Sequence, residues 1–239
     1  MMMILEGVRL IIYVTGDTHG GLDIGKLSLE NFNVQQGMTK DDFVIVAGDF
    51  GLVFSNTKRE LELRKELAAK NFSTLFIDGN HENFNILDGL PKQKWNGGLV
   101  NFINDSIIHL CRGQVYELQG LKIFTFGGAN SIDKEIRTEG VSWWPREMPS
   151  PEEYAEGLKN LDINNWQVDY IISHDCSFRT FEKLKELAWE DNPSTPLRDY
   201  FDEVEKRLSF RKWFFGHYHD DIDIDDKHTL LYRNIIRIV

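Results

Sequence analysis

Short apolar runs rich in Val, Ile and Phe recur along this chain of 239 residues, and most of them end at a glycine-containing turn. Runs of this kind suit β-strands that are buried on both faces of a sheet. They occupy residues 10–14, 43–47, 74–77, 122–126, 170–172 and 213–215. The sequence therefore predicts a series of buried strands, and the apolar tail at 229–239 predicts closing strands.

Stretches with helical signals lie between these runs. Residues 57–70 alternate charged residues with leucines. Residues 150–153 (Ser-Pro-Glu-Glu) form a capping-box pattern with proline at the first helical position, which predicts a helix to about residue 161. Thr195-Pro196 opens another helix in the same way, to about residue 208. Because helices alternate with strands, we expect an α/β domain in layers, with loops gathered at the strand ends.

The composition is that of an ordinary globular enzyme, with 41% hydrophobic and 27% charged residues. A chain of this length can bury a core without disulfides. No repeat and no linker divides it, so we predict one domain over residues 1–239. Cys111 and Cys176 lack the CxxC spacing of a zinc–thiolate site, and a reducing, cytoplasmic setting is expected.

The N-terminal segment and the net charge limit the range of partners. Glu6, Gly7 and Arg9 interrupt the apolar residues 1–14, which favours a turn and a strand over a signal peptide or a membrane span. The net charge of -11 with neutral histidines repels phosphate backbones. We therefore expect no strong nonspecific binding to nucleic acids.

Five loops carry acidic, imidazole or amide side chains directly after predicted strands. They are Gly16-Asp17-Thr18-His19-Gly20, Gly48-Asp49-Phe50-Gly51, Gly79-Asn80-His81-Glu82, Ser173-His174-Asp175 and Gly216-His217-Tyr218-His219. In α/β sheets the carboxyl ends of strands converge where ligands bind. Five of the seven histidines fall in these loops, which argues against a set of unrelated structural histidines.

The residue types in these loops suit a metal site. Carboxylate, imidazole and amide oxygen favour manganese, iron or zinc, and no thiolate is present among them. Glycine before a ligand lets the backbone turn sharply. In a strand-like turn, side chains at i and i+2 point the same way, so Asp17 with His19, and His217 with His219, could each hold one centre.

The order GD-x-H, GD, GNHE, H and GH-x-H resembles the signature of the calcineurin-like metallophosphoesterases, and it spans Asp17 to His219. The resemblance implies two packed mixed β-sheets flanked by helices, a four-layer α/β sandwich. It also implies two divalent ions, of which manganese fits best and iron or zinc is possible. One ion would take Asp17, His19 and His219, the other would take Asn80, His174 and His217, and Asp49 would bridge them. His81 would face the substrate.

A pair of divalent ions can hold a water, lower its pKa and clamp phosphoryl oxygens during in-line attack. We therefore expect a hydrolase of phosphomonoesters or phosphodiesters in which a metal-bridging hydroxide attacks and His81 protonates the leaving group. Many protein phosphatases of this family carry Asp-Arg shortly after the bridging aspartate, and residues 50–54 contain neither residue. The preferred substrate is therefore a phosphodiester or a small nucleotide, with a serine/threonine protein phosphatase as the alternative. A non-catalytic interaction module of this fold is the alternative of another class, but it would be expected to have lost some of these side chains.

A long loop at residues 127–146 follows a predicted strand, and loops of this length are commonly functional. We predict that Lys134 and Arg137 contact phosphate and that Trp143 or its neighbour packs on a base or leaving group. The alternative is that the tryptophans only seal the sheet edge.

Three further polar residues have competing interpretations. His109 is expected to be a core or sheet histidine. His228 is expected on a strand edge or a solvated turn. Asp175 could orient His174 or be an ordinary turn acid.

Overall fold

The computed structural model of the protein describes residues 11–185 and 194–239. Residues 1–10 lie outside this part, and with them the predicted leading turn and the first residue of the predicted strand 10–14. Residues 186–193 also lie outside it.

Seven strands in the described part of the chain form the first sheet, in the order β13-β1-β2-β3-β6-β5-β4. Their bounds are β1 Ile12–Thr15, β2 Phe43–Val46, β3 Ser73–Phe76, β4 Lys92–Trp95, β5 Gly98–Asn104, β6 Ile107–Leu110 and β13 Ile235–Arg237. The central strands β1, β2, β3 and β6 are parallel, whereas β13, β5 and β4 pair antiparallel with their neighbours. The sheet is therefore mixed, with its parallel strands in the middle.

The second sheet has six strands within the same described ranges, in the order β11-β12-β10-β9-β8-β7. Their bounds are β7 Gln114–Leu118, β8 Leu121–Phe126, β9 Tyr170–Ser173, β10 Lys212–Phe215, β11 Ile222–Asp223 and β12 His228–Leu230. Strands β8, β9, β10 and β12 are parallel, and β7 and β11 close the sheet in antiparallel pairing.

Each predicted apolar run coincides with a strand, with bounds that differ by one or two residues among the described positions. The predicted tail 229–239 contains β13 and all but the first residue of β12. Strands β4 to β7 and β11 were not predicted. Three of the four residues of β4 are polar and exposed, because this strand lies at the edge of its sheet. Such a strand lacks the apolar run that marks a central parallel strand.

The helices are α1 Lys58–Ala68, α2 Phe84–Leu87, α3 Pro151–Ile163, α4 Phe178–Leu184 and α5 Pro196–Arg207. The predicted helix starts at Ser150 and Thr195 are confirmed. Ser150 and Glu153 form a complete capping box on α3, and Thr195 caps α5. Thr57, for which no cap was predicted, caps α1. In each case a side-chain oxygen accepts a hydrogen bond from a backbone N–H that has no partner inside the helix.

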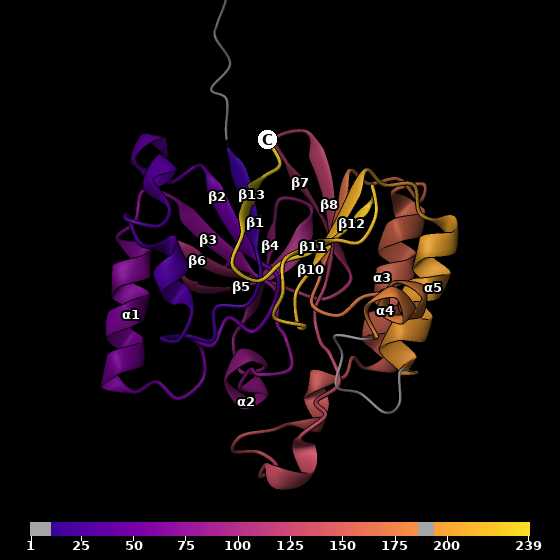
Figure 1. Cartoon of the computed structure of the whole chain (residues 1–239), viewed down its shortest axis with the longest axis horizontal. Coiled ribbons are helices and arrows are strands. Elements are labelled where there is room, and N and C mark those ends of the chain that lie inside the picture. The colour runs from indigo at the N-terminus through magenta and orange to yellow at the C-terminus, as the bar shows by residue number, and fades with distance from the viewer. Residues whose placement is uncertain (1–10, 186–193) are drawn as a thin grey trace, which may run out of the picture.

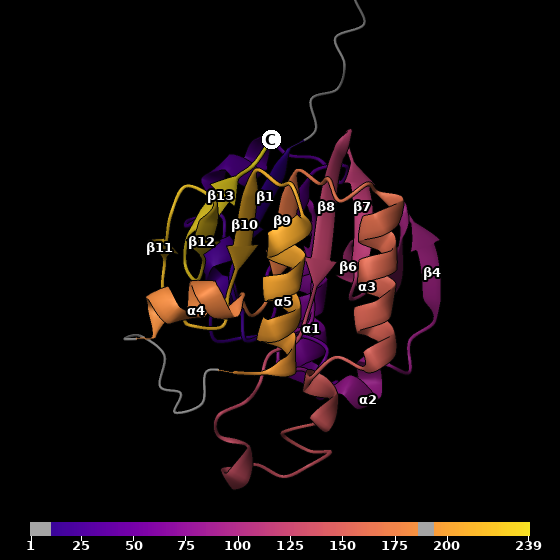
Figure 2. The same cartoon turned by 90° about the vertical axis from the view of Figure 1, so that its right-hand side faces the viewer.

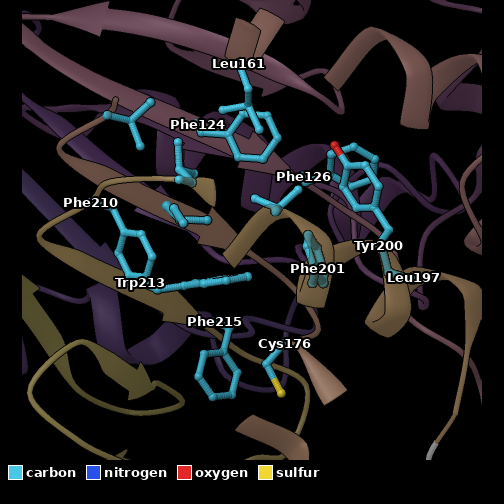
Figure 3. Packing of buried hydrophobic residues seen from close by; sticks show 14 of the residues in the cluster. Phe124, Phe126, Leu161, Cys176, Leu197, Tyr200, Phe201, Phe210, Trp213 and Phe215 are labelled. Carbon is cyan, nitrogen blue, oxygen red and sulfur yellow. The ribbon is translucent and has the colours of Figure 1, made fainter. Parts of the chain in front are cut away.

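The two sheets pack face to face between layers of helices, with α1 on one side and α3, α4 and α5 on the other (Figure 1). The core between the sheets joins β1, β2 and β3 residues such as Val14, Ile45 and Leu75 to Ile123, Ile172 and Phe214 of the second sheet. Outer cores lie under α1 and under α3, α4 and α5, where Phe126, Phe201 and Trp213 pack together (Figure 3). The predicted fold class is confirmed.

The segment between β8 and α3 extends beyond the body of the molecule at the end to which the parallel strands point (Figures 1 and 2). The helix α2 lies at the same end. Among residues 11–185 and 194–239, no helix combines the length and apolar character needed to cross a membrane.

Candidate metal centre

The predicted site residues lie on loops that follow five parallel strands. Strands β1, β2 and β3 of the first sheet lead to Asp17, Asp49 and Asn80, and strands β9 and β10 of the second lead to His174 and His217. Ligand loops from two different sheets therefore meet at one end of the sandwich. The core between the sheets holds the two sets of strand ends next to each other.

Glycines allow these loops to touch. A Cβ on Gly48 would lie 2.1 Å from His174 Nδ1, and one on Gly79 would lie 2.0 Å from Asp49 Oδ1. Gly48 also has a φ of +94°, a conformation that side chains disfavour. At these positions glycine is required by the close approach of another predicted ligand.

The first cluster consists of Asp17, His19, Asp49 and His219. One ligand atom from each lies within 4.8 Å of the others. Asp17 and Asp49 are buried, and His219 Nε2 lies 3.1 Å from Asp17 Oδ2. Two buried carboxylates and two imidazoles in this arrangement can hold a divalent cation.

The carboxylate of Asp49 faces two groups of side chains. Its Oδ2 lies 3.4 Å from His19 Nε2 in the first cluster, and its Oδ1 lies 3.4 Å from His174 Nε2. His174 Nε2 is also 3.1 Å from Asn80 Oδ1, and the rings of His174 and His217 are 5.1 Å apart. Asn80, His174 and His217 thus form a second group on the other side of Asp49.

The backbone at several of these residues is left-handed. The φ angles of His19, Asp49, His217 and His219 are 39°, 45°, 74° and 52°. Such conformations are disfavoured for residues with side chains and tend to occur at functional sites. The turns at His19, His217 and His219 are therefore not strand-like. Asp17 and His19 still lie in one cluster, as their spacing predicted. His217 and His219 do not lie together, because His217 lies against His174 and His219 lies against His19.

The electrostatics of the cluster favour positive charge. With protein groups alone, burial would lower the pKa of His174, but Asp49 and Asp17 outweigh it and raise this pKa to about 10. The same competition raises the pKa of His19 to about 9. Burial would raise the pKa of Asp49, yet His174 and His19 hold it well below its usual value. The carboxylates therefore stay ionised and attract cations.

A buried oxygen supports the fit of a metal ion. Asp17 Oδ2 accepts no well-formed hydrogen bond from the described residues, although it is fully buried. His219 Nε2 is 3.1 Å away but does not form a well-aligned hydrogen bond with it. A buried carboxylate oxygen is costly unless a cation or a good hydrogen bond compensates it. The donors in both groups are oxygen and nitrogen, so the residues present fit a pair of borderline divalent ions.

Neighbouring groups fix the histidine rings. His174 Nδ1 donates to the carbonyl oxygen of Ala47 at 2.8 Å, which leaves Nε2 for the centre. His19 Nδ1 lies 2.8 Å from Asp23 Oδ2, so its Nε2 also faces inward. Such partners set the tautomer and orientation of metal-binding histidines.

Asp23 and Tyr232 were missed by the sequence analysis. The Tyr232 hydroxyl donates to Asp23 Oδ1 at 3.0 Å, and its ring stacks on His219 with centroids 5.0 Å apart. The spacing of four residues between His19 and Asp23 was a weak sequence signal that Asp23 could contact His19. The contact of Tyr232 joins residues 209 positions apart and left no local signal.

Asp175 was expected either to orient His174 or to be an ordinary turn acid, but its side chain binds Arg198 and Tyr218. It is fully buried and paired with Arg198, whose Nε lies 3.0 Å from Asp175 Oδ2. The Tyr218 hydroxyl donates to Asp175 Oδ1 at 2.6 Å. Because Tyr218 stands between His217 and His219, this ion pair anchors the loop that carries both histidines.

His81 lies beside a cavity of about 470 Å³. The cavity is lined by Leu52, Phe54 and Leu63, by Arg59 and Arg137, and by His19 and His81. Burial and the charge of Arg137 lower the pKa of His81, against the opposing effect of Asp49. The backbone N–H of His81 donates to Asp49 Oδ1 at 2.8 Å, which ties it to the centre.

The long loop contributes Arg137 to this cavity, whereas Lys134 and Trp143 are not among the lining residues. Lys134 is exposed, and Trp143 is half-buried. Trp144 is buried and meets Phe54 edge-on with ring centroids 5.7 Å apart. One of the two tryptophans therefore packs against the cavity wall.

The two histidines predicted to be structural lie away from the cluster. His109 is buried in β6 between Asp78 and Asn101, with ring nitrogens 3.1 and 3.0 Å from their oxygens. His228 is buried at the start of β12, with Nδ1 2.8 Å from Asp225 Oδ1. His228 was predicted on a strand edge or in a solvated turn, but β12 lies between β11 and β10 and the side chain is buried, so the position is neither.

A comparison with curated proteins found no significant match. The family model of the calcineurin-like phosphoesterases matches residues 10–221, a range that contains all five ligand loops. Since this match covers most of the sequence, the chain belongs to the calcineurin-like phosphoesterase family.

Proposed function

We propose that the protein is a phosphoesterase that uses two divalent metal ions, with manganese preferred, to hydrolyse phosphodiesters or small nucleotides. The observation that supports this most is the Asp49 carboxylate, which presents one oxygen to each of two ligand groups at 3.4 Å. Asp17, His19 and His219 would hold one ion, and Asn80, His174 and His217 the other. When bound, the ions would activate a water and neutralise charge on the phosphoryl oxygens.

His81 is the proposed proton donor to the leaving oxygen. It lies between the cluster and the cavity, where the leaving group of a bound ester would sit. Its lowered pKa makes the protonated ring a stronger acid, and the negative charge of a bound phosphate would favour that protonated form. A proton delivered at this position allows an alkoxide to leave as the alcohol.

The cavity supports a small substrate. Its volume of about 470 Å³ lies in the range of small-molecule sites, and its walls combine apolar side chains with two arginines. Arg137 is held by Asp133, with Nε–Oδ1 and Nη2–Oδ2 distances of 2.7 and 2.6 Å. A guanidinium held in this way can bind a phosphate oxygen without losing much side-chain freedom.

The test of this function is a metal-reconstitution assay with bis(4-nitrophenyl) phosphate, 4-nitrophenyl phosphate, nucleotides and a phosphopeptide. We expect no turnover after chelation and recovery with two equivalents of Mn²⁺.

Manganese uptake should also release protons and strengthen as the pH rises from 6 to 8. The reason is that His19 and His174, with pKa values of about 9 and 10, must lose their protons to bind a metal. Turnover that survives chelation would contradict the proposal.

Arg137→Ala should raise KM for the best substrate roughly 10- to 100-fold and leave kcat nearly unchanged. This is the loss expected for a hydrogen bond between charged groups, about 1.5–3 kcal/mol. Lys134→Ala is the matched control on the same loop, because Lys134 does not line the cavity. Equal effects of the two substitutions would reject a specific role for Arg137.

A further inference from the structure

Asn80 differs from the other proposed ligands because its amide has an oxygen at one end and an NH₂ group at the other. Only the oxygen can bind a cation. The side chain is almost fully buried, so water does not correct its orientation. Some protein group must therefore decide which end faces the second ligand group.

A chain of hydrogen bonds from Asn80 through Ser131 to Glu147, called the relay below, sets this orientation. Asn80 Nδ2 donates to Ser131 Oγ at 3.1 Å, and Ser131 Oγ donates to Glu147 Oε2 at 2.5 Å. The backbone N–H of Ser131 donates to Glu147 Oε1 at 2.9 Å. An ionised carboxylate only accepts, so the hydroxyl proton of Ser131 points to Glu147 and its lone pair faces Asn80. The NH₂ end of Asn80 is then drawn to Ser131, and its oxygen faces His174, whose Nε2 is 3.1 Å away.

The relay is buried and held in place. Ser131 and Glu147 are exposed by only 2% and 1%. Burial raises the pKa of Glu147, and the two hydrogen bonds from Ser131 oppose this rise by favouring the carboxylate. The Nη2 group of Arg112 donates to the carbonyl oxygen of Glu147 at 2.9 Å.

Arg112 also connects Glu147 to the loop that carries Asn80. Its Nε donates to Asp78 Oδ2 at 2.7 Å, and Asp78 is two residues before Asn80. Both ends of the relay are thus fixed to the same buried guanidinium.

We propose that Ser131 and Glu147 are positioning residues that hold the amide oxygen of Asn80 toward the second metal position. This inference rests on the proposed two-metal function. Both residues belong to the segment between β8 and α3 that carries Arg137 (Figure 2). One segment therefore supplies the substrate contact and sets the affinity of the second ion.

The experiment is a calorimetric titration of Mn²⁺ into metal-depleted protein. The wild type should bind two ions. Ser131→Ala and Glu147→Gln should bind the first ion normally and the second about 10- to 100-fold more weakly, the usual effect of removing a group that orients a ligand. Glu147→Gln keeps the shape of the side chain but puts an NH₂ group against one of the two donors of Ser131, so it carries the test if Ser131→Ala does not fold.

Measurements in the Asn80→Asp variant distinguish a loss of amide orientation from a general destabilisation of the site. In Asn80→Asp both ends of the side chain are oxygens, so adding Ser131→Ala should not weaken the second ion further. Glu135→Gln is the matched control, since Glu135 is an exposed carboxylate on the same segment and does not line the cavity.

Three outcomes have distinct meanings. Unchanged affinity for the second ion in both Ser131→Ala and Glu147→Gln overturns the relay and leaves the proposed function intact. An equal loss in the Asn80→Asp background also overturns it, because the effect would then not depend on amide orientation. A wild-type protein that binds no Mn²⁺ overturns the proposed function itself.

Discussion

Replacing Asp49 with Asn should reduce phosphoesterase activity roughly 10³-fold or more and remove at least one of the two bound Mn²⁺ ions. The amide keeps the shape of the side chain but has one oxygen instead of two. Since each oxygen of Asp49 faces a different ligand group at 3.4 Å, one group must then face an NH₂ group. Losing several kcal/mol of metal-derived stabilisation corresponds to a rate effect of this size.

The measurements are kcat/KM with saturating Mn²⁺ and metal content after gel filtration. Asp42→Asn is the matched control, because Asp42 is also a buried carboxylate and lies at the opposite end of the same strand, β2. Asp42 accepts backbone hydrogen bonds from Ile11 and Thr39 at 2.6 Å each, so its loss should lower the melting temperature and spare catalysis. Two tightly bound ions and normal turnover in Asp49→Asn would rule out a bridging role.

Replacing His81 with Gln should lower kcat by about 10²–10⁴ for esters with alkyl leaving groups. The same substitution should have little effect on a 4-nitrophenyl ester, since 4-nitrophenolate leaves without being protonated. Mn²⁺ content should stay at two ions, because His81 contacts the centre through its backbone N–H, which donates to Asp49 Oδ1 at 2.8 Å. The loss should therefore appear in the chemical step and not in metal binding.

The assay compares kcat for the two leaving groups in the wild type and the variant. His228→Gln serves as the control, because His228 is buried in β12 and interacts with Asp225 away from the cluster. A variant that loses both activities equally, or neither, would show that His81 does not deliver a proton to the leaving group.

The residues that line the cavity beside His81 differ from the Asp-Arg pattern that many protein phosphatases of this family carry. Leu52 and Phe54 stand in that stretch and form apolar walls of the cavity. The guanidinium beside His81 comes from Arg137, more than eighty residues later in the chain. A positive charge thus lies near His81, but it comes from a segment outside the main sandwich.

The central strands and the ligand loops could be predicted from the sequence because their signals are local. A parallel strand buried on both faces is a continuous apolar run, and β1, β2, β3, β9 and β10 were each found in this way. The loops follow these strands directly, so their chemistry could be read from neighbouring residues. The edge strand β4 was missed because its polar residues carry no such pattern.

Only the tertiary structure decided how the side chains are combined. The sequence determined that Asp17, His19, Asp49, Asn80, His174, His217 and His219 follow strands, but not that three loops come from one sheet and two from the other. Residue spacing alone placed His217 and His219 together, whereas the family resemblance separated them. In the structure, left-handed backbone angles accompany their placement on opposite sides of Asp49. The contacts of Ser131 with Asn80 and of Tyr232 with Asp23 join residues 51 and 209 positions apart. Such contacts arise from the packing of whole layers, whereas sequence patterns report only on neighbours along the chain.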